Sequence, residues 1–358
     1  MSPGQKTIVI MAGGTGGHIM PGLAVADELH RHGWKIVWMG NPDGMEARLV
    51  PERGYEMAWV RFGALRGKGL LRKLLLPFNL LRGFVQAWRH FGHIQPDVVL
   101  GLGGFISFPG GMMAALRGIP LVLHEQNSIA GLANRVLAGV AGRVLTGFPN
   151  VLKKAAWVGN PVRPAIAALP APAARYGERT ARQEKLHLLI VGGSLGAQAL
   201  NEVLPLGLAV LAEEFRPEIV HQAGEKHLEN LRAAYERQGV AAHVTAFIDD
   251  MAGAYAWADL VICRAGALTI AELAAAGVAS ILVPFPHAVD DHQTANARFL
   301  SHAGAAILLP QAELTPEQLV LLRNLTRSQL QEMAEKARDL AMPAATESVA
   351  NVCREIAK

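Results

Sequence analysis

The stretch KTIVIMAGGTGGHIMPGLAVA, residues 6–26, begins as an apolar strand, passes through a glycine-rich turn and continues as a helix pattern. A second stretch of this kind, LHLLIVGGSLGAQALN, occupies residues 186–201 in the other half of the chain. Backbone N–H groups at such a turn can face an anion, as they do in phosphate sites. Neither turn has strict GxGxxG spacing, but two of them in one chain predict a nucleotide cleft between two domains.

The length and the alternation of apolar patterns indicate the fold class. A chain of 358 residues exceeds the size at which one hydrophobic core keeps growing, so we expect two domains. Short runs rich in Val, Ile and Leu alternate with longer helical patterns, which predicts an α/β fold with parallel sheets covered on both faces. The expected strands are residues 6–12, 35–40, 56–61, 97–101, 120–124, 143–146 and 156–159 in the first half, and 186–191, 218–222, 243–247, 259–263, 280–283 and 305–309 in the second.

Proline and alanine are concentrated in residues 160–185, which makes this stretch the expected linker. We place the first domain at residues 1–163 and the second at residues 164–342. Pro343 precedes a last helical pattern, and we expect this C-terminal helix, within residues 343–358, to pack back on the first domain.

The composition also bears on location and redox state. No uncharged apolar run approaches the roughly 20 residues that span a bilayer, and the start MSPGQK lacks the apolar segment of a signal peptide. We therefore expect the chain to stay in the cytoplasm. Its two cysteines, Cys263 and Cys353, fit no disulfide framework or zinc spacing, so both are expected to be reduced and structural.

Residues 61–89 carry seven Arg or Lys and no acidic residue, although the whole chain has a net charge of only +4. Leucines, phenylalanines and a tryptophan alternate with these cations, as in surfaces that dock on anionic lipid and insert shallowly. The alternative is a core helix with a solvated basic rim. Nucleic acid is disfavoured as a partner because no stacking series or binding motif accompanies the charges. The cations inside this segment are Arg66, Lys68, Arg72, Lys73 and Arg82, with Arg61 and Arg89 at its ends.

Parallel sheets bind ligands at the carboxyl ends of their strands, and His18 follows the first strand there, at the start of a helix. The positive end of the helix dipole disfavours the imidazolium ion, so we expect a neutral ring that can accept a proton as a general base. The alternative is a histidine that only caps or hydrogen-bonds the turn. A further glycine turn, GLGGFISFPG at residues 101–110, follows the fourth expected strand and could equally be a tight connection.

The segment RAGALTIAELAAA, residues 264–276, ends a strand and opens a helix with free backbone N–H groups. Glu272 lies one turn into this helix and could accept the vicinal hydroxyls of a ribose. It could also be a favourable acid near a helix N-terminus and nothing more. The later segment PFPHAVDDHQTANA, residues 284–297, carries groups that suit sugar hydroxyls, among them Gln293 and Asn296, or a solvated loop with a helix cap.

Seven motifs in order resemble the MurG family of bacterial glycosyltransferases, over nearly the whole chain. They are GGTGGH (13–18), GLGGFISFPG (101–110), HEQNSIAGLANR (124–135), VGNPVR (158–163), GGSLGA (192–197), FIDDM (247–251) and the run from RAGALTIAELAAAG to DDHQTANAR (264–298). The resemblance implies a GT-B fold: two Rossmann-like domains with parallel sheets that face each other across a cleft. It places the UDP-GlcNAc donor mainly on the C-terminal domain and the lipid acceptor on the N-terminal one.

The resemblance also implies roles for individual residues. His18 matches the proposed base of the family. Ser194 and Arg163 would contact the diphosphate, and the backbone of Ile248 would bind the uracil. Glu272 would bind the ribose, while Asn127 and Gln293 would orient the sugar. The implied donor-binding set is Thr15, Gly16, Gly17, Asn127, Arg163, Ser194, Ile248, Ala267, Leu268, Thr269, Ile270, Ala271, Glu272 and Gln293.

The implied reaction is an inverting transfer of GlcNAc to the MurNAc 4-hydroxyl of lipid I, which forms lipid II for peptidoglycan. No cofactor is expected, and the absence of an Asp-x-Asp motif argues against an intrinsic metal clamp. The resemblance further implies a peripheral enzyme at the cytoplasmic face of the inner membrane, in contact with anionic lipid and with other proteins of cell-wall synthesis.

Other functions share parts of this pattern. A nicotinamide-dependent dehydrogenase would explain the first glycine turn, but no acid ends the second strand, which runs KIVWMGNPDG. A noncatalytic membrane scaffold would explain the basic segment but not the glycine turns. A UDP-sugar epimerase or a UDP-glucosyl lipid synthase has the same architecture, and physical reasoning from the residues leaves both open.

Overall fold

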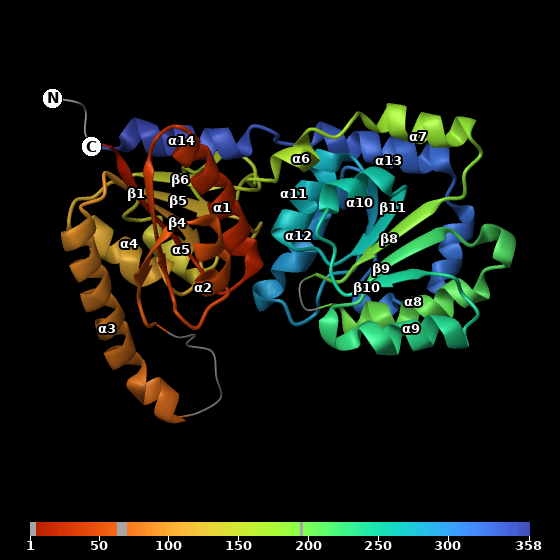
Figure 1. Cartoon of the computed structure of the whole chain (residues 1–358), viewed down its shortest axis with the longest axis horizontal. Coiled ribbons are helices and arrows are strands. Elements are labelled where there is room, and N and C mark those ends of the chain that lie inside the picture. Colours follow the sequence, from red (N-terminus) through yellow and green to blue (C-terminus); the bar gives the residue numbers. More distant parts are fainter. Residues whose placement is uncertain (1–4, 63–69, 194–195) are drawn as a thin grey trace. The chain divides into compact units, whose positions relative to one another are not determined.

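The computed structural model describes residues 5–62, 70–193 and 196–358; the side chains of residues 70–76 and 289 are outside the description. The chain divides into two compact units. Unit 1 comprises Met1–Pro161 and Pro343–Lys358, and unit 2 comprises Val162–Met342. Each unit is built around its own parallel sheet with helices on both faces (Figure 1).

The sheet of unit 1 has the strand order β3-β2-β1-β4-β5-β6-β7, and all of its pairings are parallel. The order reverses between β1 and β4, which pair directly from Ile8 opposite Val98. This reversal is the topological switch point, where open α/β sheets bind ligands. The elements are β1 (Thr7–Ala12), α1 (Gly16–Arg31), β2 (Lys35–Gly40), α2 (Glu46–Leu49), η1 (Pro51–Arg53), β3 (Glu56–Trp59), α3 (Leu70–Ile94), β4 (Val98–Gly103), α4 (Ser107–Leu116), β5 (Leu121–Glu125), α5 (Leu132–Leu137), β6 (Arg143–Thr146), β7 (Ala156–Trp157) and α14 (Ala345–Ile356).

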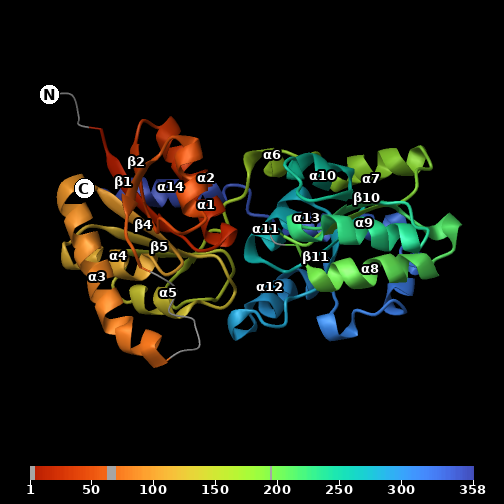
Figure 2. The same cartoon turned by 60° about the horizontal axis from the view of Figure 1, so that its bottom comes forward.

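The side chains of β1 supply both faces of this sheet because successive residues point to opposite sides. Ile8 and Ile10 pack with α1 and α14, whereas Val9 and Met11 pack with α3 and α4. The C-terminal helix α14 thus covers the sheet of unit 1 beside α1 (Figure 2). Its buried Cys353 belongs to that core, and burial raises the pKa of the thiol.

Unit 2 has a sheet of order β10-β9-β8-β11-β12-β13, again entirely parallel. Its switch point lies between β8 and β11. The elements are α6 (Pro164–Ala167), α7 (Pro172–Ala181), β8 (His187–Val191), α8 (Gln198–Val210), η2 (Glu213–Phe215), β9 (Glu218–Gln222), η3 (Glu225–His227), α9 (Leu228–Arg237), β10 (His243–Thr245), α10 (Met251–Trp257), β11 (Leu260–Cys263), α11 (Ala267–Ala276), β12 (Ala279–Leu282), η4 (Val289–Asp291), α12 (His292–Ser301), β13 (Ala306–Leu308), η5 (Gln311–Glu313), η6 (Gln318–Asn324) and α13 (Arg327–Asp339).

The boundary between the units, at Pro161 and Val162, lies inside the expected linker of residues 160–185, but most of that stretch is helix packed into unit 2. Pro164 and Pro172 each stand at the first turn of a helix, where a missing N–H costs nothing. Tyr176 of α7 is fully buried, and its hydroxyl donates to the carbonyl oxygen of Asp259 at 2.7 Å. The prolines that suggested a linker therefore mark helix starts.

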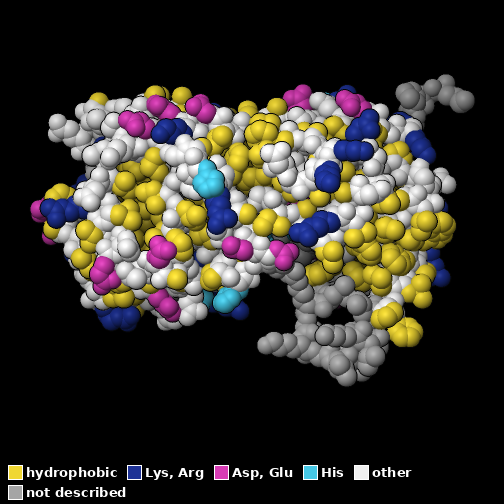
Figure 3. Space-filling model, turned by 180° about the vertical axis from the view of Figure 1, so that it is seen from behind, with side chains coloured by type: hydrophobic (Ala, Val, Ile, Leu, Met, Phe, Trp, Pro, Cys, Tyr) yellow, Lys and Arg dark blue, Asp and Glu magenta, His cyan; other side chains and the backbone are white. Residues whose placement is uncertain are grey.

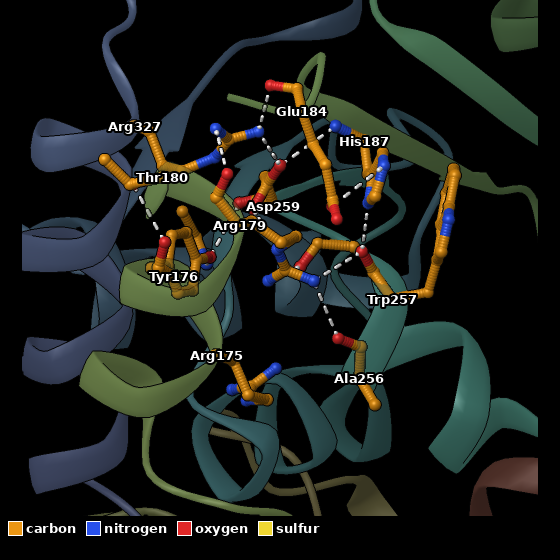
Figure 4. A network of polar contacts seen from close by, with 12 residues as sticks. Arg175, Tyr176, Arg179, Thr180, Glu184, His187, Ala256, Trp257, Asp259 and Arg327 are labelled. Carbon is orange, nitrogen blue, oxygen red and sulfur yellow. Dashed lines mark hydrogen bonds and ion pairs between the residues drawn. The ribbon is translucent and has the colours of Figure 1, made fainter. Parts of the chain in front are cut away.

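A buried ion cluster fastens α7 and α13 to the sheet of unit 2 (Figure 4). The carboxylate of Asp259, at the start of β11, is fully buried and lies 2.9 Å from Nε of Arg179. Nη2 of Arg327 lies 3.2 Å from the same carboxylate, which also accepts the backbone N–H of His187 at 3.0 Å. Two helices and two strands thus converge on one carboxylate.

Helix α3 presents apolar side chains outward as well as inward. Ala87 and Phe91 are buried in the core of unit 1. On the outer face, the exposed apolar side chains recur at helical spacing: Phe78 (71% exposed), Leu81 (61%), Val85 (41%) and Trp88 (43%). None of the helices in the described residues is both long enough and apolar enough to cross a membrane.

We predict that Asp259→Ala lowers the free energy of unfolding by about 3–5 kcal/mol, because it leaves two buried guanidinium groups without their counter-ion. Urea unfolding followed by circular dichroism measures this change. Glu178→Ala is the control, because Glu178 pairs with Arg182 on an exposed surface of α7 and should cost at most about 1 kcal/mol. Equal losses in the two variants would show that the buried cluster does not hold unit 2 together.

Candidate active site

The candidate site residues of unit 1 lie in the loops that follow β1, β4 and β5. Thr15 is the N-cap of α1, and Gly16, Gly17 and His18 form its first turn. Thr15 and Gly17 are exposed, while Gly16 and His18 are half-buried. The predicted position of His18 at a helix N-terminus is thus confirmed, and its first turn holds no acidic residue.

The first glycine turn already faces an anion from the protein itself. Glu46, which begins α2 and is buried, accepts the N–H of Gly14 at 3.2 Å and that of Asn41 at 3.0 Å. A Cβ on Gly13 would lie 2.4 Å from Oε1 of Glu46, so the glycine makes room for the carboxylate. The N–H of Gly14 is therefore already used within the protein, and a phosphate at the rest of this turn stays a prediction. Sequence reasoning missed Glu46, although it follows the second strand closely.

Gly103, the last residue of β4, and Gly104 after it let this segment approach His18. Gly103 and Gly104 both have positive φ, at +102° and +80°. A Cβ on Gly103 would lie 2.9 Å from Cε1 of His18, and one on Gly104 would lie 2.3 Å from the carbonyl oxygen of Gly13. The glycine turn at residues 101–110 is thus more than a tight connection, because its backbone forms one wall around the His18 ring.

The loop after β5 is organised by Glu125, which is buried. Its Oε1 accepts the backbone N–H of Asn127 at 2.9 Å, and its Oε2 accepts Nδ2 of Asn134 at 2.7 Å and the N–H of Gly131 at 3.1 Å. Asn127, one of the expected sugar-orienting residues, is therefore held at a fixed place in the loop. The next residue, Gln126, reaches His18: its Oε1 lies 2.9 Å from Nδ1 of the ring. The sequence singled out neither Glu125 nor Gln126 for this role.

In unit 2, the second glycine turn is closed by a neutral side chain. Gln222, at the end of β9, accepts the N–H of Gly193 at 3.2 Å and donates to the carbonyl oxygen of the same residue at 2.9 Å. Gly196 has φ +76°, and a Cβ there would lie 2.1 Å from the carbonyl oxygen of Ala223. Helix α8 begins directly after this turn, with no acidic residue in its first turn. The predicted site residue Ser194 lies outside the described residues.

Glu272 and Arg163 are brought together, although 109 positions separate them in the sequence. Nε and Nη2 of Arg163 donate to Oε1 of Glu272 at 3.1 and 2.8 Å, and the hydroxyl of Tyr255 donates to Oε2 at 3.2 Å. Burial raises the pKa of the Glu272 carboxyl, while Arg163 and Tyr255 act in the opposite direction. One of the two Glu272 oxygens that were expected to accept ribose hydroxyls is thus already bound by Arg163.

The remaining predicted residues of unit 2 surround the same edge of its sheet. Ala267, Leu268 and Thr269 form the first turn of α11, whose N-cap is Gly266, with Ile270 and Ala271 following. Ile248 lies in the loop between β10 and α10. Gln293 is the second residue of α12 and accepts the backbone N–H of Phe285 at 2.9 Å through Oε1. Asn296 is buried and donates to the carbonyl oxygen of Ala265 at 3.2 Å, which joins α12 to the loop before α11.

Neither unit gathers a set of metal ligands in the part of the chain that the structure describes: no group of three or more His, Cys, Asp or Glu side chains could hold an ion. The described polar groups at the two sheet edges include backbone N–H groups, amides, the imidazole of His18, and carboxylates that are already hydrogen-bonded within the protein. Such groups can bind hydroxyls and a diphosphate and can transfer one proton.

Both units match one enzyme family. Residues 8–146 match the N-terminal domain of glycosyltransferase family 28, and residues 187–352 match its C-terminal domain. The chain belongs to glycosyltransferase family 28. Its two parallel-sheet units therefore form the GT-B fold of this family, and the predicted fold class is confirmed.

Curated family 28 relatives are similar over their whole length. The UDP-N-acetylglucosamine–N-acetylmuramyl-(pentapeptide) pyrophosphoryl-undecaprenol N-acetylglucosamine transferase of Dechloromonas aromatica (strain RCB) is 69% identical over 99% of this chain and 100% of its own. The enzyme of the same name from Azoarcus sp. (strain BH72) is 68% identical over 99% of both chains. The crystal structure of Acinetobacter baumannii MurG superposes with a TM-score of 0.85 at 42% identity, and covers 98% of this chain and 99% of its own. The predicted resemblance is thus confirmed.

We predict that Gly104→Ala lowers both the stability and the turnover of this family 28 enzyme, because its Cβ would collide with the backbone of Gly13 beside His18. Gly33→Ala is the matched control: its φ is +81°, but nothing lies within 4 Å of its Cβ. The control should cost roughly 1–2 kcal/mol from backbone strain alone and leave kcat unchanged. Thermal unfolding and kcat measure the two effects; identical behaviour of both variants would show that the close approach at Gly104 is unimportant.

Proposed function

We propose that this chain transfers GlcNAc from UDP-GlcNAc to the 4-hydroxyl of MurNAc in lipid I, with inversion at the anomeric carbon, to form lipid II. The observation that carries the proposal is the full-length similarity, at up to 69% identity, to curated transferases whose name states this donor and acceptor. The chemistry of the two sheet edges is in keeping with such a hexosyltransferase. A place in peptidoglycan synthesis, and hence in cell-wall growth, cell shape and cell division, follows from the product.

The charges at the two glycine turns favour unit 2 as the holder of the diphosphate. In unit 1, the N–H of Gly14 is occupied by the carboxylate of Glu46, which would repel a second anion. In unit 2, the turn at Gly193 is closed by the neutral amide of Gln222. The N-termini of α8 and α11, without acidic residues in their first turns, can stabilise the charge that develops on UDP as it leaves.

The other donor contacts follow from the positions of the side chains in unit 2. Oε2 of Glu272 receives one hydrogen bond, from Tyr255, so it retains capacity to accept a ribose hydroxyl. Arg163 fixes the opposite oxygen of that carboxylate and adds positive charge near the donor. Ile248 would meet the uracil and Gln293 the sugar; Asn127, together with Thr15, Gly16 and Gly17, would complete the site from unit 1.

His18 is our candidate for the general base. In the proposed step it takes the proton of the acceptor 4-hydroxyl, whose oxygen forms a bond to the anomeric carbon. The bond from that carbon to the β-phosphate oxygen breaks, and its electron pair leaves with UDP. UDP needs stabilisation of its charge more than it needs a proton, so one base and several N–H donors suffice.

We predict that His18→Ala lowers kcat by about 10²–10⁴-fold, the usual contribution of a general base, and changes the KM for UDP-GlcNAc little. The assay uses radiolabelled UDP-GlcNAc and a short-chain lipid I analogue, with UDP-glucose and a diacylglycerol acceptor as the competing pair. His32→Ala, at the exposed C-cap of the same helix, is the control and should be unaffected. Near-wild-type turnover of His18→Ala would remove His18 from the mechanism, and preference for the competing pair would overturn the proposed substrates.

We further propose that the outer face of α3 docks on the anionic surface of the cytoplasmic face of the inner membrane, where the lipid acceptor is anchored. Figure 3 shows hydrophobic side chains gathered on this side of unit 1 with Lys and Arg around them. The exposed Arg82 and Arg89 flank the apolar row defined by Phe78, Leu81 and Trp88. The side chains of Arg66, Lys68, Arg72 and Lys73 are outside the described part. Proteins of the cell-wall synthesis machinery could share this location.

We predict that replacing Phe78 and Leu81 together by serine weakens binding to vesicles of phosphatidylglycerol and phosphatidylcholine by roughly tenfold or more, since each side chain should contribute about 1 kcal/mol on partial insertion. Co-sedimentation at low and high salt measures the partition. The control replaces Leu206 and Val210, which are exposed on α8 in unit 2, and should bind as the wild type does. Wild-type protein that ignores anionic vesicles even at low salt would contradict the proposal.

A further inference from the structure

We propose that Gln126 and His124 fix the tautomer of His18, so that Nδ1 carries the proton and Nε2 presents a lone pair to the acceptor hydroxyl. The inference deepens the proposed function, because it rests on His18 as the base. It assigns Gln126 and His124 as positioning residues, which act through His18 and not on the substrate. The argument runs along one chain of hydrogen bonds, from Gly159 to His18.

The far end of this chain is a backbone carbonyl, which can only accept. Nε2 of His124 lies 2.9 Å from the carbonyl oxygen of Gly159, so this nitrogen must carry a proton. His124 is fully buried, and burial lowers the pKa of its imidazole, which keeps the ring neutral. A neutral ring has only one N–H. Nδ1 of His124 is therefore a lone pair that can only accept.

The orientation of the Gln126 amide follows from the two acceptors next to it. Its Nε2 lies 3.1 Å from Nδ1 of His124 and 3.1 Å from the carbonyl oxygen of the same residue. Rotating the amide by half a turn would place an oxygen against these two acceptors. The nitrogen must therefore face His124. The backbone of Gln126 is held as well, because its carbonyl oxygen accepts Nδ2 of Asn160 at 2.9 Å.

The other end of this series of hydrogen bonds, at His18, is then determined as well. With its nitrogen facing His124, Gln126 presents Oε1 to His18, at 2.9 Å from Nδ1. A carbonyl oxygen can only accept, so Nδ1 of His18 must donate. In the described part of the chain, no hydrogen-bond partner lies at Nε2 of His18. The proton thus sits on the protein side of the ring and the lone pair remains for a substrate proton.

The direction of these hydrogen bonds matters because a neutral imidazole exists as two tautomers, and only one of them has its lone pair on Nε2. In a Ser-His-Asp triad, an amide that imposes the wrong tautomer costs about 10⁴ in kcat. Here the amide imposes the useful one, since it accepts from His18 and is itself oriented by His124. A neutral amide also adds no charge beside the ring, unlike the carboxylate of such a triad.

The test is the tautomer of His18 itself, read by ¹⁵N NMR of the full chain labelled at the histidine imidazoles. His18→Gln identifies the His18 signals by their loss. We expect a protonated Nδ1 and an unprotonated Nε2 in the wild type near pH 8, and a mixture of tautomers in Gln126→Leu. Gln126→Glu keeps an acceptor oxygen toward His18 and should keep Nδ1 of His18 protonated. Its other oxygen faces Nδ1 and the carbonyl oxygen of His124, so this variant must bind one extra proton between residues 124 and 126. A wild-type mixture, a wild type protonated at Nε2, or an unchanged spectrum in Gln126→Leu would overturn the proposal.

Kinetics supply the second readout. Gln126→Leu should lower kcat by about tenfold or more, while KM for UDP-GlcNAc stays within about twofold and Gln126→Glu recovers part of the loss. Gln86→Leu is the matched control, because Oε1 of Gln86 also accepts one N–H, from Arg61, but on α3 and away from His18. Should Gln126→Leu fail to fold, the spectra of the wild type and of Gln126→Glu still show which nitrogen of His18 carries the proton. An active His18→Gln would refute the base and leave the tautomer result intact, so the two failures are distinguishable.

Discussion

A buried carboxylate on a glycine turn decides how the two halves of this enzyme differ. Both units contain a strand, a glycine turn and a helix at the switch point of a parallel sheet, and both turns need a partner for their backbone N–H groups. Glu46 satisfies Gly14 in unit 1 with a negative charge, whereas Gln222 satisfies Gly193 in unit 2 without one. The same architecture therefore gives two different units. The turn of unit 2 is suited to an anionic nucleotide, whereas in unit 1 the N–H of Gly14 is already bound to the carboxylate of Glu46.

Unit 1 can then serve the proposed proton transfer by His18. Gly103 allows the backbone after β4 to approach the His18 ring, and Gln126 fixes its Nδ1 from the other loop. Glu125 holds that second loop through several N–H groups, so the amide of Gln126 comes from a rigid segment. The proposed base is thus positioned by the amide of Gln126, by Glu125 behind that amide, and by the close approach of Gly103. In unit 2, Arg163 holds the carboxylate of Glu272 in place and carries a positive charge beside it.

The fold could be predicted from the sequence because apolar runs are local signals, and each of the thirteen strands in the described residues overlaps an expected run. The helices within residues 164–181 were missed because proline at a helix start and proline in a linker have the same composition, and only the burial of Tyr176 separates them. His18 and Glu272 could be singled out as candidates because each follows a strand, His18 in the first turn of a helix and Glu272 one turn into another. Glu46 and Gln126 were not, because their partners lie 32 and 108 positions away, and such hydrogen bonds leave no spacing to recognise.

The asymmetry of the two glycine turns is tested most directly by a crystal structure of the enzyme with UDP-GlcNAc. The account predicts that the diphosphate lies at the N-termini of α8 and α11 in unit 2, while Gly14 keeps its hydrogen bond to Glu46. A diphosphate bound on the backbone of Gly14, with the Glu46 carboxylate displaced, would contradict it.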